Sequence, residues 1–478
     1  MRNDPIELSR LSAEVEAKAP VYTELSDRIW GMPELRFAEH RSVEAQIAQL
    51  EAEGFTVTRD VAGIPTAFVA ESGDGGPVIG FLGEFDALAG LSQEAGVAEP
   101  RAEVPGGSGH GCGHNLLGAG AMLAAVTARD ALRTQGLPGT VRYYGCPGEE
   151  GGSGKTFMAR EGVFDGLDAA VTWHPGPLNG VMSVKSLANF QVYFRFRGKA
   201  SHAAGSPHLG RSALDAVELM NVGVNYLREH VPQDSRVHYA ITDSGGVSPN
   251  VVQARAEVLY LIRAPRVEQA KALFDRVVEC ARGAAIMTGT TMTMEVDKAC
   301  SETLPNTTLE MALHGNLLNI GAPAYDAADR DFAAAIKGTL SEEDVSSSLA
   351  SFGAEAALGG AALHDGVLPF DGTSIIQHGS TDVGDVSQIV PTVQAWGGCW
   401  AVGTPFHTWQ AVAQGKSGQA HKGMVQAAKA MAATALDAFR DPELLARAKA
   451  ELTERRGGRA YECPIPAEVV APPLRVVR

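Results

Sequence analysis

Short apolar runs separated by helical segments are the feature that most constrains how this chain can fold. One continuous apolar run covers residues 77–82, and two more follow at 140–144 and 169–173. Short runs without alternation are typical of strands buried on both faces of a parallel sheet. A helix rich in small residues is expected between the first two runs, at 115–133. This alternation of strand and helix predicts a doubly wound α/β domain.

The pattern changes after residue 187. Residues 189–198 alternate, with four apolar side chains on one face, as in an antiparallel strand that is wet on one side. Further elements are expected as a helix, two strands, a helix and a strand at 212–230, 236–242, 254–264, 267–287 and 291–297. The order β-α-β-β-α-β is that of the ferredoxin-like split motif. It predicts a small α+β domain at 188–304, inserted between two parts of the α/β domain at 1–187 and 305–478.

Composition narrows the class of protein. With 478 residues the chain is long enough for two domains. A net charge of −16 argues against nucleic-acid binding, because phosphates would be repelled. No apolar run approaches the roughly 20 residues that span a bilayer. The six cysteines are scattered without framework spacing, which favours free thiols and a cytoplasmic location.

The triplet Cys112-Gly113-His114 lies in a glycine-rich turn that opens into the expected helix at 115–133. Glycine lets the backbone fold tightly, so both side chains can converge on one point. The helix start is expected to favour a thiolate over a thiol. A thiolate and an imidazole suit a divalent metal, but a lone triplet of this kind is as well explained by an ordinary loop.

Other chemically active side chains follow the ends of predicted strands. Glu84 and Asp86 come directly after the run at 77–82, and the sequence then offers Glu149-Glu150, His174 and His407. Alone, each is as readily a solvated turn or a core histidine. Together, at the strand ends of one sheet, they supply enough thiolate, imidazole and carboxylate groups for two divalent ions. The combination therefore predicts a two-metal site.

The motifs G-H-x-C-G-H-N, G-E-E-G, W-H-P, G-x-x-S-H-A-A, S-T-D-V-G-D-V-S and F-H-T-W together resemble the M20 family of metallopeptidases. Within it they are most similar to the amidohydrolase branch, in particular the group of aminobenzoyl-glutamate hydrolase large subunits. The resemblance covers nearly the whole chain. It implies a bilobal fold whose inserted domain is a lid that dimerises, and it raises the question of a second, homologous subunit.

The resemblance also implies an activity: a hydrolase dependent on two divalent metal ions, Mn²⁺ or Zn²⁺, that cleaves the amide between an acyl group, such as an aromatic one, and an amino acid such as glutamate. Cys112 would bridge the two ions. The remaining metal ligands would be His114, Glu150, His174 and His407. Glu149 would be the general base that takes a proton from the attacking water and delivers it to the leaving amine.

Four further residues have roles that the resemblance implies. Asp86 matches an acidic position that orients a ligand histidine, although other members carry His-x-Asp where this chain has Glu84-Phe85-Asp86. In the lid, His202 would stabilise the oxyanion across the dimer. Asn250 would contact substrate, and Arg263 would grip a substrate carboxylate or pair with an acid of the other domain.

Three rival hypotheses remain open at this stage. The same metal site can serve a dipeptidase or an enzyme that removes an aromatic amine. Cys112 and His114 can instead form a nucleophilic cysteine hydrolase, which leaves the downstream acids and histidines unused. A binding protein with a vestigial site is the third hypothesis, and the intact ligand set argues against it.

Overall fold

A computed structural model describes residues 5–472 of the chain, which form two compact units. The outermost residues of the predicted 1–187 and 305–478 segments lie outside the described range. The first unit comprises the described residues up to Lys185, Leu304–Ile376 and Val386–Tyr461. The second comprises Ser186–Thr303, Gln377–Asp385 and the described residues from Glu462 onward. None of the helices within 5–472 combines the length and apolarity needed to cross a membrane.

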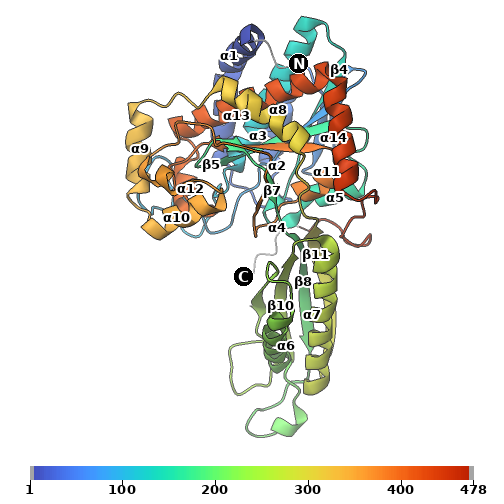
Figure 1. Cartoon of the computed structure of the whole chain (residues 1–478). Coiled ribbons are helices and arrows are strands. Elements are labelled where there is room, and N and C mark those ends of the chain that lie inside the picture. Colours follow the sequence, from blue (N-terminus) through green and yellow to red (C-terminus); the bar gives the residue numbers. More distant parts are fainter. Residues whose placement is uncertain (1–4, 473–478) are drawn as a thin grey trace. The chain divides into compact units, whose positions relative to one another are not determined.

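The first unit is built on a seven-stranded sheet with the order β1-β2-β4-β3-β5-β13-β6 (Figure 1). Its strands are β1 (Thr56–Arg59), β2 (Phe68–Asp74), β3 (Val78–Gly83), β4 (Gly139–Gly145), β5 (Ala169–Gly176), β6 (Gly180–Val181) and β13 (Thr392–Gly398). The four central strands β4, β3, β5 and β13 are parallel. This confirms the α/β class, but β1, β2 and β6 pair antiparallel, so the sheet is mixed.

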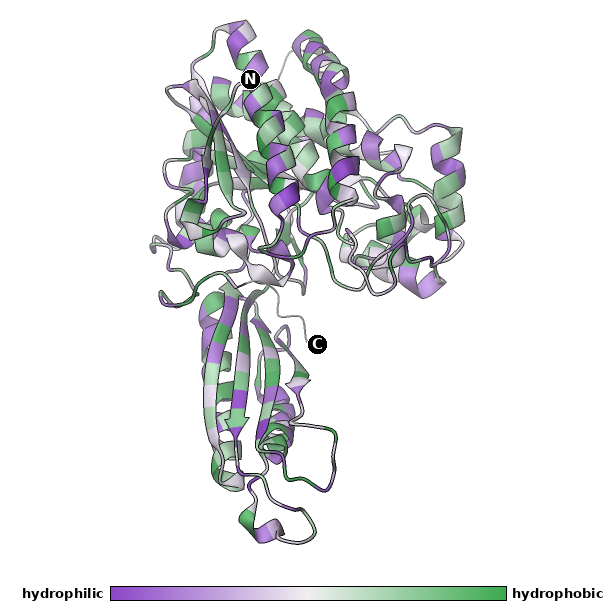
Figure 2. Ribbon diagram, turned by 180° about the vertical axis from the view of Figure 1, so that it is seen from behind, coloured by the Kyte–Doolittle hydropathy of each residue, from purple (hydrophilic) through white to green (hydrophobic). Residues whose placement is uncertain are grey.

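Helices pack on this sheet through small side chains. The helix α3 (His114–Gln135) contacts both α1 (Pro5–Trp30) and α13 (Gly418–Arg440) in the largest apolar core of the unit. A Cβ atom at Gly120 would come within 2.8 Å of the Trp173 ring. Small residues in α3 are therefore required by the close approach of sheet and helix. Figure 2 shows the apolar colouring of these elements.

Several shorter elements complete the first unit. Its other helices are α2 (His40–Ala52), α4 (Glu149–Gly152), α5 (Gly154–Arg160), α8 (Thr307–Ile320), α9 (Ala327–Lys337), α10 (Glu342–Ser351), α12 (Trp409–Gln414) and α14 (Pro442–Arg455). The helix α11 (Val383–Ile389) follows a small parallel pair formed by β7 (Val184–Lys185) and β12 (Ile375–Ile376). The helix expected over 414–439 is interrupted after Gln414 and resumes at Gly418 with Ser417 as its N-cap.

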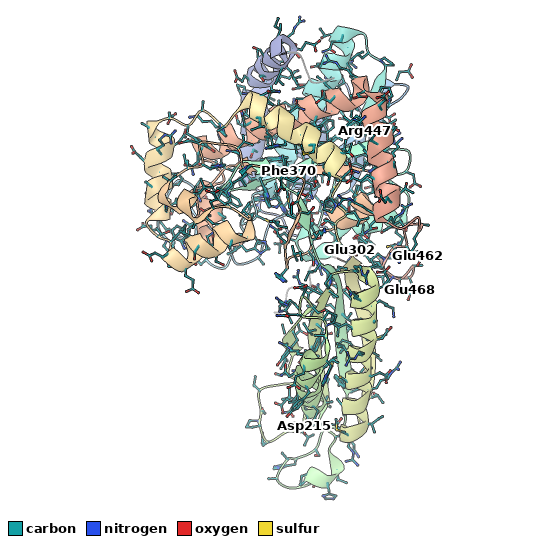
Figure 3. All side chains as sticks on the ribbon, viewed as in Figure 1. Asp215, Glu302, Phe370, Arg447, Glu462 and Glu468 are labelled. Atoms are coloured by element: carbon teal, nitrogen blue, oxygen red, sulfur yellow. The ribbon has the colours of Figure 1, made fainter. Side chains whose placement is uncertain are left out.

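The second unit has a four-stranded antiparallel sheet with the order β11-β8-β10-β9. It consists of β8 (Ala188–Arg197), α6 (Ala213–Leu227), β9 (Arg236–Asp243), β10 (Arg255–Ala264), α7 (Val267–Thr288) and β11 (Thr291–Cys300). The order of elements is the predicted β-α-β-β-α-β. The face of β8 that carries Phe190 and Phe194 is buried, as its alternation indicates. Figure 3 labels Asp215, whose backbone N–H is capped by Ser212 at the start of α6.

Candidate metal centre

The parallel strands of the first unit collect the candidate ligands at one edge of the sheet. β3, β4, β5 and β13 run in the same direction, so their carboxyl ends meet there. Functional groups gather at this edge in open α/β sheets. The structure brings together in this way all the sequence-predicted metal ligands and acids of the first unit: Asp86, Cys112, His114, Glu149, Glu150, His174 and His407.

Cys112 and His174 approach each other through the turn before α3. Gly113 has φ of 73°, a left-handed conformation that favours glycine, and a Cβ there would come within 2.7 Å of Pro175. The close packing places Cys112 Sγ 3.5 Å from His174 Nε2. The sulfur and the imidazole nitrogen therefore converge on one point, as the glycine-rich turn predicts.

His174 is held in the tautomer that a metal ligand needs. Its Nδ1 donates a hydrogen bond to the carbonyl of Pro175 at 2.8 Å, which leaves the lone pair on Nε2 facing Cys112. Burial and the nearby charge of His114 lower the pKa of His174 to about 3. The ring is therefore neutral and available as a ligand.

His114 is oriented by Asp86. Its Nδ1 donates to Asp86 Oδ1 at 2.9 Å, while Asp86 Oδ2 accepts the backbone N–H of Glu150 at 2.7 Å. Both oxygens of Asp86 are thus engaged with neighbouring protein groups. The carboxylate ties the start of α3 to the turn that carries Glu150, and it directs His114 Nε2 toward the cluster.

Glu149 and Glu150 lie in a tight turn after β4. Gly148 and Gly151 both have positive φ, at 65° and 74°. The turn is anchored by a buried acid that the sequence analysis did not single out: Glu39 Oε1 accepts the backbone N–H of Gly148 at 2.9 Å. Burial and the charge of Asp86 raise the pKa of Glu39 to about 8.

His407 occupies a strained backbone conformation beside Glu150. Its φ is 60°, in the left-handed region that costs a non-glycine residue about 1–2 kcal/mol. A hydrogen bond from its backbone N–H to Gly111 O at 2.9 Å holds it there. Its Nε2 lies 3.1 Å from Glu150 Oε1, and the side chain is 52% exposed. Among the predicted ligands it is the one that solvent reaches most easily.

Sequence reasoning missed the roles of Glu84 and Lys155. Glu84 Oε2 lies 3.1 Å from His114 Nε2, and its Oε1 accepts a hydrogen bond from Lys155 Nζ at 2.6 Å. Both side chains are buried. The position of Glu84 after β3 was a usable signal for the carboxylate. Lys155 gave no signal, because a lysine within Gly-Ser-Gly-Lys looks like part of a solvated turn.

The donor set fits divalent metal ions. Three groups have ligand atoms within 4.8 Å of one another: Cys112 with His114 and His174, Cys112 with Glu150 and His407, and Glu84 with His114 and Glu149. Cys112 and His114 are each shared between two groups. His114 Nε2 and Glu150 Oε1 are buried yet lack a hydrogen bond of acceptable geometry. A mixed sulfur, nitrogen and oxygen set around a shared thiol suits Zn²⁺ or Mn²⁺.

The protonation of Cys112 differs from the sequence expectation. Burial and the charge of Glu150 raise the pKa of the thiol in the metal-free chain. The expected lowering by the helix start is outweighed, because a buried thiolate lacks water to solvate it. Metal binding would therefore displace a proton from this sulfur.

His202 lies in the second unit and is preorganised as a hydrogen-bond donor. Its Nδ1 accepts the backbone N–H groups of Ala204 at 3.2 Å and Gly205 at 3.0 Å. The proton must then be on Nε2, and the residue is exposed. The turn thus presents an N–H donor to the surface.

Asn250 and Arg263 also belong to the second unit. The carbonyl of Asn250 accepts the backbone N–H of Ala203 at 2.9 Å, which ties its loop to the His202 turn. Arg263 is farther along β10, where its Nη1 donates to Ser380 Oγ at 3.0 Å. The structure therefore joins His202 and Asn250 in one loop cluster and places Arg263 on a separate strand.

The sequence matches peptidase family M20/M25/M40 over residues 80–471. The chain belongs to this family. As an M20 protein it is a hydrolase that acts on carbon–nitrogen bonds. The match includes every candidate metal ligand described above.

Curated relatives extend the M20 assignment. The Escherichia coli K12 enzyme p-aminobenzoyl-glutamate hydrolase has two types of subunit, and the chain is 52% identical to one of them, over 96% of this chain and 98% of that protein. It is 31% identical to the Xaa-Arg dipeptidase of Mus musculus, over 92% and 90% of the two chains. The M20 chain is thus an amidohydrolase similar to the first of these E. coli subunits.

Solved structures share the M20 fold. An aminobenzoyl-glutamate utilization protein from Klebsiella pneumoniae has a TM-score of 0.59 at 17% identity, covering 89% of this chain and 98% of that chain. A dinuclear metal-binding M20 peptidase from Bacillus subtilis has a TM-score of 0.54 at 17% identity, covering 89% and 99%. Both agree with the mixed sheet and the separate antiparallel sheet described above.

Proposed function

We propose that this M20 hydrolase cleaves the amide bond between an aromatic acyl group and an amino acid such as glutamate, with p-aminobenzoyl-glutamate as the representative substrate. The observation that carries the proposal is the convergence of Cys112 with two ligand groups at one sheet edge. The 52% identity to one type of subunit in the E. coli p-aminobenzoyl-glutamate hydrolase supports this choice of substrate.

The proposed holoenzyme contains two divalent ions, Mn²⁺ or Zn²⁺. Cys112 would bridge them, with His114 and His174 on one side and Glu150 and His407 on the other, in agreement with the two Cys112 groups. Asp86 would orient His114 without binding metal, since both its oxygens already accept hydrogen bonds. The ions would polarise the substrate carbonyl and acidify the attacking water.

Glu149 is the proposed general base. It follows β4 at the sheet edge, and one of its oxygens lies within 4.8 Å of ligand atoms of Glu84 and His114. Such a carboxylate can take the proton of the attacking water and return it to the leaving amine nitrogen. The reaction yields a free acid and a free amino acid.

The second unit would supply the remaining contacts. His202, whose Nε2–H points away from its own turn, would donate to the oxygen that becomes negative as water adds to the carbonyl. Asn250, in the same loop cluster, would contact substrate. Arg263 would bind the carboxylate of the amino-acid half.

A second copy of the chain is the proposed partner of the second unit. β9 is an edge strand, and its Tyr239 and Ile241 are exposed. On α6 the exposed residues Leu219, Val222 and Tyr226 recur at helical spacing and form one face. Apolar side chains beside an open strand edge suit a pairing surface. The other type of subunit in the E. coli hydrolase is 30% identical over 46% of this chain, which makes a homologous second protein the competing partner.

A cytoplasmic location is part of the proposal. The six cysteines are all free in the described structure, and four of them are buried. Free buried thiols are typical of proteins kept in a reducing compartment.

A dipeptidase is the second candidate, because the chain also resembles Xaa-Arg dipeptidase over most of both lengths. To separate the two, the purified protein would be loaded with Mn²⁺ or Zn²⁺ and assayed for p-aminobenzoate released from p-aminobenzoyl-glutamate, and for arginine released from Xaa-Arg dipeptides. The proposal expects p-aminobenzoate release to be faster. It is contradicted if only dipeptides are cleaved, or if no amide is cleaved with and without the homologous second protein.

A further inference from the structure

A cavity of about 570 Å³ lies in the first unit, beside the candidate metal centre. Its walls come largely from the loop-rich stretch between α10 and β12, for which the sequence offered no function. The apolar part of the lining includes Phe352, Leu368, Phe370 and Trp396. Figure 3 labels Phe370 among the side chains of this unit.

One wall of the cavity is shared with the metal-ligand cluster. Trp396 lies on β13 in register with His174 on β5, so the two side chains project from the same face of the sheet. Their ring centroids are 5.7 Å apart in an edge-on arrangement. Phe352 packs on Trp396 with centroids 4.6 Å apart, and both rings line the cavity. A group bound against Trp396 would therefore lie one ring away from a metal ligand.

The charges of the lining select which half of a substrate can bind there. Among its described residues the only ionisable side chains are Glu355, His364 and Asp371, so it includes no lysine or arginine. His364 is buried and its Nδ1 accepts the backbone N–H of Asn179 at 3.0 Å, which uses that lone pair. A substrate carboxylate would meet repulsion from the two acids. An aromatic ring that carries a hydrogen-bond donor would instead find apolar walls and carboxylate acceptors.

We propose that this cavity is the acyl-binding site and that it selects an aromatic acyl group bearing a donor such as an amino substituent. The inference rests on the proposed function and adds the location and chemistry of its specificity. Trp396 and Phe352 would hold the ring, with Glu355 and Asp371 at the end that receives the donor. The amino-acid half, with its carboxylates, is left outside this cavity.

Ala354 offers a way to fill the cavity, because it lies on the lining and its side chain is small. Ala354→Trp and the milder Ala354→Leu would be compared with Ala328→Trp, a control at an exposed position of α9. Two substrates with the same amino-acid half, p-aminobenzoyl-glutamate and acetyl-glutamate, report on the acyl group alone. The ratio of their kcat/KM values is expected to fall at least about 10-fold in Ala354→Trp, and less in Ala354→Leu. It should stay unchanged in the control. Circular dichroism and metal content check folding.

Direct binding makes the test independent of turnover. In metal-free protein, p-aminobenzoate should give saturation-transfer NMR signals that weaken strongly in Ala354→Trp and remain in Ala328→Trp. An unchanged kcat/KM ratio in a folded Ala354→Trp protein would overturn the acyl-site assignment, as would p-aminobenzoate binding that the variant leaves intact. If no amide is hydrolysed by any form while p-aminobenzoate still binds in the cavity, the proposed reaction fails and the site assignment stands.

Discussion

Lys155 donates a hydrogen bond from Nζ to Glu84 Oε1 across 2.6 Å, and neither side chain is more than 4% exposed. The pair lies next to His114, which contacts the other oxygen of Glu84. An ion pair so deeply buried links the first turn of α5 to the end of β3. It therefore connects the two segments that carry the acids of the cluster.

Removing one member of this pair should destabilise the protein. Lys155→Met leaves a buried carboxylate without its cation, and such changes cost about 3–5 kcal/mol. The double variant Lys155→Met/Glu84→Gln should recover much of that loss. Denaturation in the presence of chelator measures the differences. Lys271→Met, which breaks an exposed pair with Asp275, should change stability by less than about 1 kcal/mol. Equal effects at the two sites would contradict the buried role.

Glu149→Gln should lower kcat by about 10³-fold, because the amide cannot accept the proton of the attacking water. The metal content, measured by mass spectrometry, should remain that of the wild type, since Glu149 is not one of the proposed ligands. Glu103→Gln, at an exposed loop position, is the matched control. Loss of metal together with activity would reassign Glu149 as a ligand.

Asp86→Asn should weaken metal binding by about 10–100-fold without removing a ligand, which is the usual effect of losing a group that orients a ligand histidine. The asparagine amide can no longer serve both His114 Nδ1 and the Glu150 backbone N–H as an ionised acceptor. Competition with a metal indicator gives the affinity. The exposed Asp74→Asn is the control, and equal affinities in the two variants would sink the positioning role.

Chelation should abolish turnover, and adding Mn²⁺ or Zn²⁺ should restore it. The nucleophilic-cysteine hypothesis expects the reverse: full activity in chelator and inactivation of metal-free protein by iodoacetamide. Burial raises the pKa of Cys112, so the metal-free thiol should also react slowly with iodoacetamide at pH 7. Rapid alkylation accompanied by loss of a metal-independent activity would support the rival mechanism.

Glu310 should make the stability depend on pH. Burial raises the pKa of its carboxyl from 4.5 to about 7, although a hydrogen bond with Ser183 opposes the shift. Between these values the folded state retains a proton that the unfolded state has released. Stability therefore falls as pH rises through this window and is level above it. The gain of Glu310→Gln over wild type should grow by about 3 kcal/mol between pH 5 and 8. A pH-independent difference in denaturation midpoints would contradict this.

Much of the fold was predictable because its signals are local. Continuous apolar runs located β3, β4 and β5, and the alternation around Phe190 located the second sheet. The antiparallel pairing of β2 with β4 was not predictable, since a short buried strand has the same pattern in either direction. The break after Gln414 was missed because Gly415 and Ser417 lie in an otherwise continuous helical pattern.

By itself, the sequence determined which residue types stand at the strand ends, from Asp86 through Cys112 to His407, and so the class of chemistry. Those signals depend on neighbours along the chain. Only the tertiary structure decided that Lys155 supports Glu84, that the Nδ1 hydrogen bond of His174 frees its Nε2, and that Trp396 separates a ligand histidine from a cavity. Each of these depends on contacts between segments distant in sequence, which packing and burial select and no local pattern encodes.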